Sequence, residues 1–233
     1  EYARFLQGMA EKHKINLRIY DNFFKLVTTL IYEKKIDFNI VDKERSSLIA
    51  ELSKIISKET LTELVTKSLS FKTAKISSVE FYSYLKGLAL ANGIDIMKKY
   101  SNLFNYIIYN GVYSKIENEK LFKNIKEVET AVKEKLFAND DQRTLDKLAY
   151  HVDIILGLIN IKLLNDDFDY YTAHKLEFSN DVFLDFLRKK AAQFGLVCDV
   201  DDPGDAIVNS IPKLEDFYSI AIKRDKALVD NTL

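Results

Sequence analysis

The sequence has 233 residues, of which 47% are hydrophobic and 30% are charged, as in a soluble globular chain. Its 34 basic and 35 acidic residues leave a net charge of -1 with the two signs interspersed, so no basic block indicates a nucleic-acid partner. The single cysteine excludes an internal disulfide, and no apolar run reaches the roughly 18 residues that a membrane-inserted helix needs.

Only 7 glycines and 2 prolines interrupt the chain, which predicts long helices joined by short connections. No signal peptide opens the sequence, and a single thiol fits a reducing compartment, so we expect a cytoplasmic protein. The chain begins with Glu1 and ends at Leu233 inside a helical pattern. We therefore expect it to be a piece of a longer protein.

Four helices are predicted in the first eighty residues, because apolar side chains recur at helical spacing. Asp21 is expected to cap the second helix, and the third helix is expected to start near Asp42. The predicted inward positions are Tyr2, Phe5, Leu6 and Met9; Phe23, Phe24, Val27, Leu30 and Ile31; Leu48, Leu52 and Ile56; and Leu61, Leu64, Val65 and Leu69.

The pattern then restarts. Residues 80–95, EFYSYLKGLALANGID, match the opening EYARFLQGMAEKHKIN at an offset of 79, with Gly87 at the position of Gly8. One inserted residue changes the offset to 80, and the matches continue at Tyr100, Asn102 and Phe104, which correspond to Tyr20, Asn22 and Phe24. The sequence therefore predicts an internal repeat of roughly eighty residues, with three or four helices in each copy.

The two glycines make the repeat specific, because glycine inside a helix costs up to about 1 kcal/mol relative to alanine. Close approach of another helix backbone would compensate for that cost in both copies. We therefore expect Gly8 and Gly87 to lie at helix crossings, and Tyr2, Phe5 and Leu6 to superpose on the residues Phe81, Tyr84 and Leu85.

The copies diverge after Leu136, where a longer helix is expected from Asp141 through Leu164. A last helix is expected to start at Pro212, and no segment alternates as a strand does. The predicted fold is an all-α helical array. Its expected parts are repeat 1 at residues 1–79, repeat 2 at residues 80–164 and divergent C-terminal helices at residues 165–233, packed on the repeats as one unit.

One acidic stretch, DVDDPGD at residues 199–205, resembles the start of a calcium loop, because Asp199 and Asp201 alternate before a glycine. The stretch departs from that pattern at Pro203 and at Ser210, which occupies the place of the bidentate glutamate. We interpret it as an acidic turn that precedes a helix.

A second acidic stretch, NDDFDY at residues 165–170, places Asp166 and Asp169 at helical spacing, as in the magnesium-binding helices of prenyl-transferring enzymes. Such a site needs a facing acidic motif, for which NDDQRTLD at residues 139–146 is the candidate. Helix capping explains both stretches with fewer assumptions. We therefore expect no metal and no cofactor, and keep a metal-dependent enzyme as an alternative.

The three histidines, His13, His151 and His174, share no metal-ligand spacing, and we expect His151 to be a packed or surface residue. Cys198 has no neighbouring base in the sequence, which predicts an inert thiol. The 13 tyrosines and 15 phenylalanines indicate aromatic packing between helices, or a surface that faces a partner.

Two stretches, KLFKNIKEVETAVKEKLF at residues 120–137 and FYSIAIKRDKALVDNTL at residues 217–233, resemble parts of an uncharacterised bacterial family with TraB/ChaN (Tiki-like) features. In that group an Arg-Asp or Arg-Asn pair lies near a metal-dependent hydrolase site. The resemblance implies that Arg224 and Asp225 correspond to that pair. The histidine-bearing glycine motifs of the group do not occur in this sequence.

Two functions follow from these observations. The first is a non-enzymatic all-α repeat module for protein interaction or scaffolding, whose partner is another protein or other domains of the same chain. The second, implied by the resemblance, is the helical accessory region of a TraB/ChaN-like hydrolase whose catalytic residues lie mostly outside these residues. Neither function involves nucleic acid or insertion into a membrane.

Overall fold

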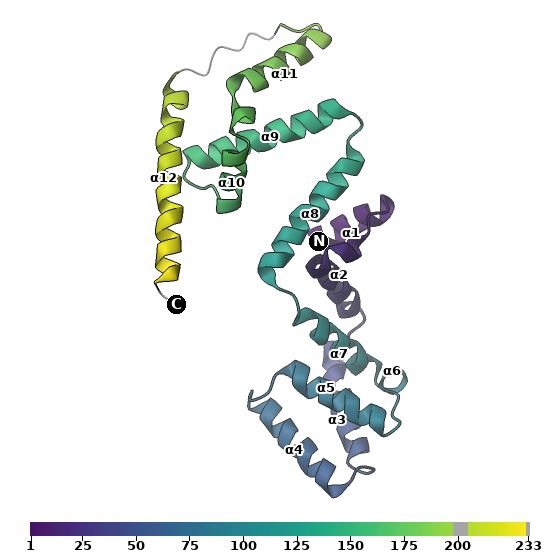
Figure 1. Cartoon of the computed structure of the whole chain (residues 1–233). Coiled ribbons are helices and arrows are strands. Elements are labelled where there is room, and N and C mark those ends of the chain that lie inside the picture. The colour runs from purple at the N-terminus through teal and green to yellow at the C-terminus, as the bar shows by residue number, and fades with distance from the viewer. Residues whose placement is uncertain (198–204, 232–233) are drawn as a thin grey trace. The chain divides into compact units, whose positions relative to one another are not determined.

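A computed structural model describes residues 1–197 and 205–231. These residues form helices and contain no strand, which confirms the predicted all-α class (Figure 1). Within the same residues, no helix combines the length and apolar character that crossing a membrane requires. The helices are α1 (Tyr2–Lys12), η1 (Leu17–Ile19), α2 (Asp21–Glu33), α3 (Phe38–Leu52), α4 (Lys58–Lys72), α5 (Ser78–Ala91), α6 (Ile96–Lys99), α7 (Ser101–Tyr113), α8 (Asn118–Leu136), α9 (Asp140–Ile159), α10 (Asn165–Ala173), η2 (Lys175–Phe178), α11 (Asn180–Gln193) and α12 (Asp205–Asp230).

The chain divides into two compact units, Glu1–Leu136 (unit 1) and Phe137–Leu233 (unit 2). The boundaries expected from the sequence fall elsewhere, after residues 79 and 164. Unit 1 contains α1 to α8 and therefore holds all of the first predicted copy together with helices α5 to α8 of the second.

Side-chain caps determine where several helices begin. Two starts differ from the sequence prediction. Asp21 is the first helical residue of α2 and pairs with Lys25 at 2.6 Å without capping the helix, and α3 begins at Phe38, before the expected start at Asp42. The side chains that accept a backbone N–H bond from the first turn of a long α-helix include those of Asp37, Ser57, Ser77 and Asn139.

Unit 1 contains two apolar cores on either side of the packed pair α2 and α7. In one core α8 packs on α1 and α2, and in the other α3 packs on α5 and α7 (Figure 1). Each core thus joins helices that are far apart in the sequence. The first core buries Leu6, Phe23, Val27, Val128 and Val132. The second buries Val41, Leu48, Leu52, Leu64, Phe81, Tyr82, Leu85, Ala89, Ile96, Tyr100, Leu103 and Ile107.

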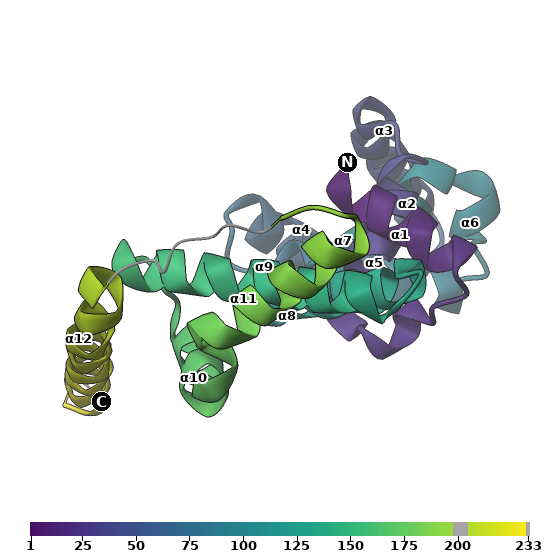
Figure 2. The same cartoon turned by 90° about the horizontal axis from the view of Figure 1, so that it is seen from above.

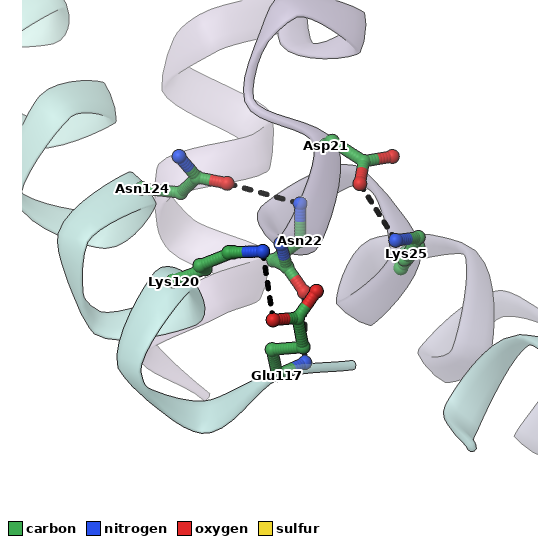
Figure 3. Close-up of polar contacts among 6 residues, drawn as sticks. All are labelled: Asp21, Asn22, Lys25, Glu117, Lys120 and Asn124. Atoms are coloured by element: carbon green, nitrogen blue, oxygen red, sulfur yellow. Dashed lines mark hydrogen bonds and ion pairs between the residues drawn. The ribbon is translucent and has the colours of Figure 1, made fainter. Parts of the chain in front are cut away.

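Polar contacts connect the start of α8 to the start of α2 (Figure 3). The Oδ1 atom of Asn22 accepts a hydrogen bond from the Glu117 amide at 2.8 Å, and the Asn22 amide donates to Asn124 Oδ1 at 2.9 Å. A matching contact occurs at the start of α3, where Asn102 Oδ1 accepts from the Asp37 amide at 2.9 Å. These asparagines therefore link the connection before α8 to α2 and the connection before α3 to α7.

Several expectations for α1 and α5 are wrong. A Cβ atom added at Gly8 or Gly87 would meet nothing within 4 Å, so neither glycine lies at a helix crossing. Tyr2 and Phe5 are exposed, whereas Leu6 is buried as expected. Tyr2 and Phe5 are exposed because α1 contacts its neighbours only along a narrow stripe, and the positions beside that stripe remain in solvent.

Unit 2 is built around α9, and α12 crosses it near the C-terminal end of α9 (Figures 1 and 2). The Tyr218 hydroxyl accepts a hydrogen bond from the Leu163 amide at 2.8 Å, which ties α12 to the turn after α9. Pro212 lies inside α12, whose first residue is Asp205, so the predicted start of this helix is wrong. The core of unit 2 buries Ile154, Leu158, Phe168, Tyr171 and Tyr218.

Candidate functional site

The acidic pair predicted as a metal alternative lies in α10. Asp166 is in its first turn, both Asp166 and Asp169 are exposed, and no side-chain cap starts this helix. Among the described residues, no group of three or more His, Cys, Asp and Glu side chains could hold a metal ion. Asp166 therefore lies near the positive N-terminal end of α10, where a negative charge is stabilised. Within the described residues, no further metal ligands gather around it.

The facing motif at residues 139–146 begins α9, where Asn139 caps the helix by accepting from the Gln142 amide at 3.0 Å. Asp140 pairs with Arg143 at 2.7 Å, and Asp141 pairs with Lys190 of α11. The interpretation of Asn139 as a cap is confirmed. The carboxylates beside it bind cationic side chains of unit 2.

The Arg224 and Asp225 side chains bind each other on α12, with 2.9 Å between Nη2 and Oδ1 and 3.1 Å between Nε and Oδ1. Both side chains are well exposed, so water screens the interaction. Cys198 and the acidic stretch at residues 199–204 lie outside the described residues.

A groove of about 520 Å³ runs between α3 and α4 in unit 1. Its two walls are consecutive helices joined by a short connection that ends at the Ser57 cap. The lining is mainly aliphatic, and none of it is acidic. The lining residues are Arg45, Ser46, Ile49 and Ala50 of α3 and Leu61, Leu64, Val65, Ser68, Leu69 and Lys72 of α4.

Helix α4 carries more apolar side chains than it buries in the core of unit 1. Leu64 points into the core of unit 1 and is 1% exposed, whereas Val65 and Leu69 are 59% and 62% exposed. Successive helical residues are turned by about 100°, so Val65 and Leu69 form a second apolar stripe beside the one that holds α4 in place. The groove therefore combines a buried floor with an exposed apolar edge.

Aromatic packing holds α4 in its position against α5. Phe71 stacks on Phe81 with 4.5 Å between ring centroids and meets Tyr82 edge-on at 5.6 Å. Phe81 and Tyr82 are both buried. Rigid packing of this kind fixes the α4 wall, so the groove exists before a partner arrives.

Polar atoms lie at the margin of the groove. Arg45 Nη1 contacts Asp42 Oδ1 at 2.9 Å and Tyr82 Oη at 3.1 Å. The Ser68 hydroxyl oxygen is buried and has no hydrogen-bond partner within the described part of the chain.

A second cluster of titratable groups surrounds His151 in unit 2. The His151 side chain is 1% exposed, its ring stacks on Phe178 at 4.1 Å, and Nε2 lies 3.2 Å from Tyr170 Oη. Lys147 Nζ pairs with Glu177 Oε2 at 2.6 Å beside it. Burial lowers the pKa of His151, and the positive charge of Lys147 lowers it further. The ring is therefore neutral at pH 7 and packs as part of the core.

His174 also belongs to this cluster, because its ring stacks on Tyr170 at 4.2 Å. His13 lies in unit 1. Sequence reasoning left open whether His151 is packed or exposed. Its position three residues after Leu148 and three before Ile154, both buried, is the signal that indicates an inward-facing side chain.

Comparisons of the chain with protein-family models, with curated proteins and with solved structures find no match. We therefore infer function from the geometry of the groove and from its chemistry.

Proposed function

We propose that unit 1 is a non-enzymatic protein-interaction module and that the α3–α4 groove is its docking surface. The observation that carries this proposal is the second apolar stripe of α4, in which Val65 and Leu69 stay exposed beside the buried Leu64. A helical partner would cover that stripe with its own apolar residues, as in other complexes where a helix lies in a groove. The partner is another protein or another segment of a longer chain that includes these residues.

We also propose an internal repeat of roughly eighty residues, of which unit 1 contains the first copy and the first part of the second. Three correspondences support it. α2 and α7 begin at Asp21 and Ser101, α3 and α8 begin at Phe38 and Asn118, and both pairs are 80 residues apart. The acceptor asparagines Asn22 and Asn102 are also 80 residues apart, and so are their donors, Asp37 and Glu117. The buried pairs that share this spacing are Phe23 with Leu103, Val27 with Ile107, Leu48 with Val128, and Leu52 with Val132.

In this arrangement each copy contributes its third helix to the core of the other copy. An ancestral pair of identical subunits that exchanged a helix would produce the same packing after gene fusion. The absence of paired cysteines is in keeping with a cytoplasmic address, which we include in the proposal. We assign no catalytic role to Arg224 and Asp225, because each binds the other.

A synthetic helical peptide tests the docking role. The probe has roughly 18 residues, or about five turns, with leucine at i, i+3, i+4 and i+7 spacing and glutamine beside that stripe. We expect saturable changes in the methyl resonances of Val65 and Leu69 in the full chain. A peptide of the same composition with a scrambled leucine pattern should give none.

Matched variants localise the binding. Val65→Ser and Leu69→Ser should each weaken peptide binding roughly tenfold, because each removes an apolar contact at the centre of the interface. Phe122→Ser is the control, since Phe122 is an exposed apolar residue of unit 1 on α8, outside the groove. Equal losses in all three variants would show that the peptide binds apolar surface without preference for the groove.

A further inference from the structure

The charged side chains that line the groove are all cationic. Of its ten lining residues two are cationic, Arg45 and Lys72, and none is acidic. On each helix the cation is the lining residue farthest along the chain from the connection between α3 and α4. The apolar lining therefore ends, on both walls, in a positive charge.

Arg45 is held in place by contacts that use one nitrogen. Its Nη1 atom binds Asp42 and Tyr82, and no hydrogen bond or ion pair within the described residues involves Nε or Nη2. A carboxylate that approaches the Nε and Nη2 edge of a guanidinium can accept two parallel hydrogen bonds. Asp42 is largely exposed, so its pairing with Arg45 is weak and leaves that cation attractive to a partner.

Lys72 offers a second charge. It is the last residue of α4, is exposed, and makes no ion pair with any residue that the structure describes. Two cations bordering an apolar groove complement a ligand that carries both an apolar stripe and carboxylates.

We infer that the groove takes an amphipathic helix of a partner protein whose apolar stripe is bordered by glutamate or aspartate side chains, and that Arg45 and Lys72 bind those carboxylates. This inference rests on the proposed docking role of the groove and adds the chemistry of the partner. The apolar stripe provides most of the contact area, and the carboxylates determine which helices are accepted and in which direction.

Three peptides with the same leucine stripe test the inference, with glutamate, glutamine or lysine at the flanking positions. The dissociation constants of the full chain for each are measured by fluorescence anisotropy. We expect the glutamate peptide to bind about tenfold more tightly than the lysine peptide, with the glutamine peptide between them. Added salt should reduce that ratio, because the charges that determine it are partly exposed.

Variants assign the preference to the two cations. Lys72→Gln should reduce the ratio severalfold, and Lys72→Glu should reverse the order of the glutamate and lysine peptides. Arg45→Lys keeps the charge but removes the bidentate edge, so it should weaken binding of the glutamate peptide and leave the glutamine peptide unchanged. Lys58→Gln is the control, because Lys58 starts the same helix outside the groove and should leave the ratio unchanged.

The possible results separate the two proposals. Saturable binding of all three peptides with equal affinity would overturn the acidic preference and leave the docking role standing. If no peptide binds, the docking role itself fails. A concentration-dependent dimer that Leu69→Ser abolishes would identify the occupant as a second copy of this chain and would contradict the inference.

Discussion

Asn22 accepts a hydrogen bond from the backbone amide of Glu117, at 2.8 Å from Oδ1, across 95 residues of chain. Asn22 is 3% exposed, and its own amide donates to Asn124, so the start of α2 and the start of α8 are joined twice. The corresponding contact of Asn102 with Asp37 joins the connection before α3 to the start of α7. These two asparagine side chains thus anchor the connections that precede α8 and α3.

Replacing Asn22 with alanine should lower the free energy of unfolding of unit 1 by about 1–3 kcal/mol, because the Glu117 amide loses its acceptor in a partly buried position. Chemical denaturation monitored by circular dichroism measures this change. Asn39→Ala is the matched control, since Asn39 is exposed on α3 and should change stability by less than about 0.5 kcal/mol. A similar loss in both variants would mean that the Asn22 contact contributes little.

Gly87→Ala should stabilise unit 1 by about 0.5–1 kcal/mol, because glycine lies inside α5 and its added Cβ would meet open space. No comparable gain is expected at Gly157 of α9, where an added Cβ would lie 3.0 Å from Leu163 Cδ1 and the Leu163 side chain would have to shift. Thermal melting of the two variants measures the difference. A melting temperature raised as much by Gly157→Ala as by Gly87→Ala would contradict the packing described around Leu163.

Stability of unit 2 should fall as the pH drops below about 6.5, the ordinary pKa of histidine. The sign follows from the lowered pKa of His151, because the unfolded chain binds a proton at a higher pH than the folded chain does. The loss should continue until the pH passes through the folded-state pKa. Hydrogen exchange of peptides from α9 and α10, compared between pH 7.5 and pH 5.5, measures it.

His151→Gln removes the titrating group and should flatten this pH dependence, at some cost in stability at neutral pH, because the ring packs on Phe178. His13→Gln in unit 1 should leave the exchange of α9 and α10 as it is in the unmodified chain. An undiminished pH dependence in His151→Gln would assign it to the carboxylates of the unit.

Local periodicity predicted the all-α class and most of the buried positions. Leu48, Leu52 and Leu64 face inward as expected, because each lies on the apolar stripe of a helix. The first residue of each helix was harder to predict. Asp21 was expected to cap α2, but it is the first helical residue and Tyr20 occupies the cap position. Capping geometry depends on the backbone angles of a single residue, which periodicity does not reveal.

The groove could not be predicted, because it depends on the separation of two helices and on which of several apolar residues the core uses. Val65 and Leu69 have the same spacing and chemistry as residues that are buried elsewhere in the chain, and the sequence predicted that they face inward. The expectation that Gly8 and Gly87 lie at crossings failed for a related reason. A glycine in a helix allows another helix to pack closely against it, but it does not ensure that such a helix is present.

The packing of α8 on α1 and α2 has a consequence for synthesis on the ribosome. Phe23 and Val27 of α2 are covered by Val128 and Val132 of α8, which follow them by about 100 residues. At roughly 5–20 residues per second, the nascent chain would expose that apolar face for about 5–20 s before its cover is translated. The site of α3 on α5 and α7 is complete sooner, so the second core can form first. Early chaperone contact is therefore expected at α1 and α2, which are translated well before α8 covers them.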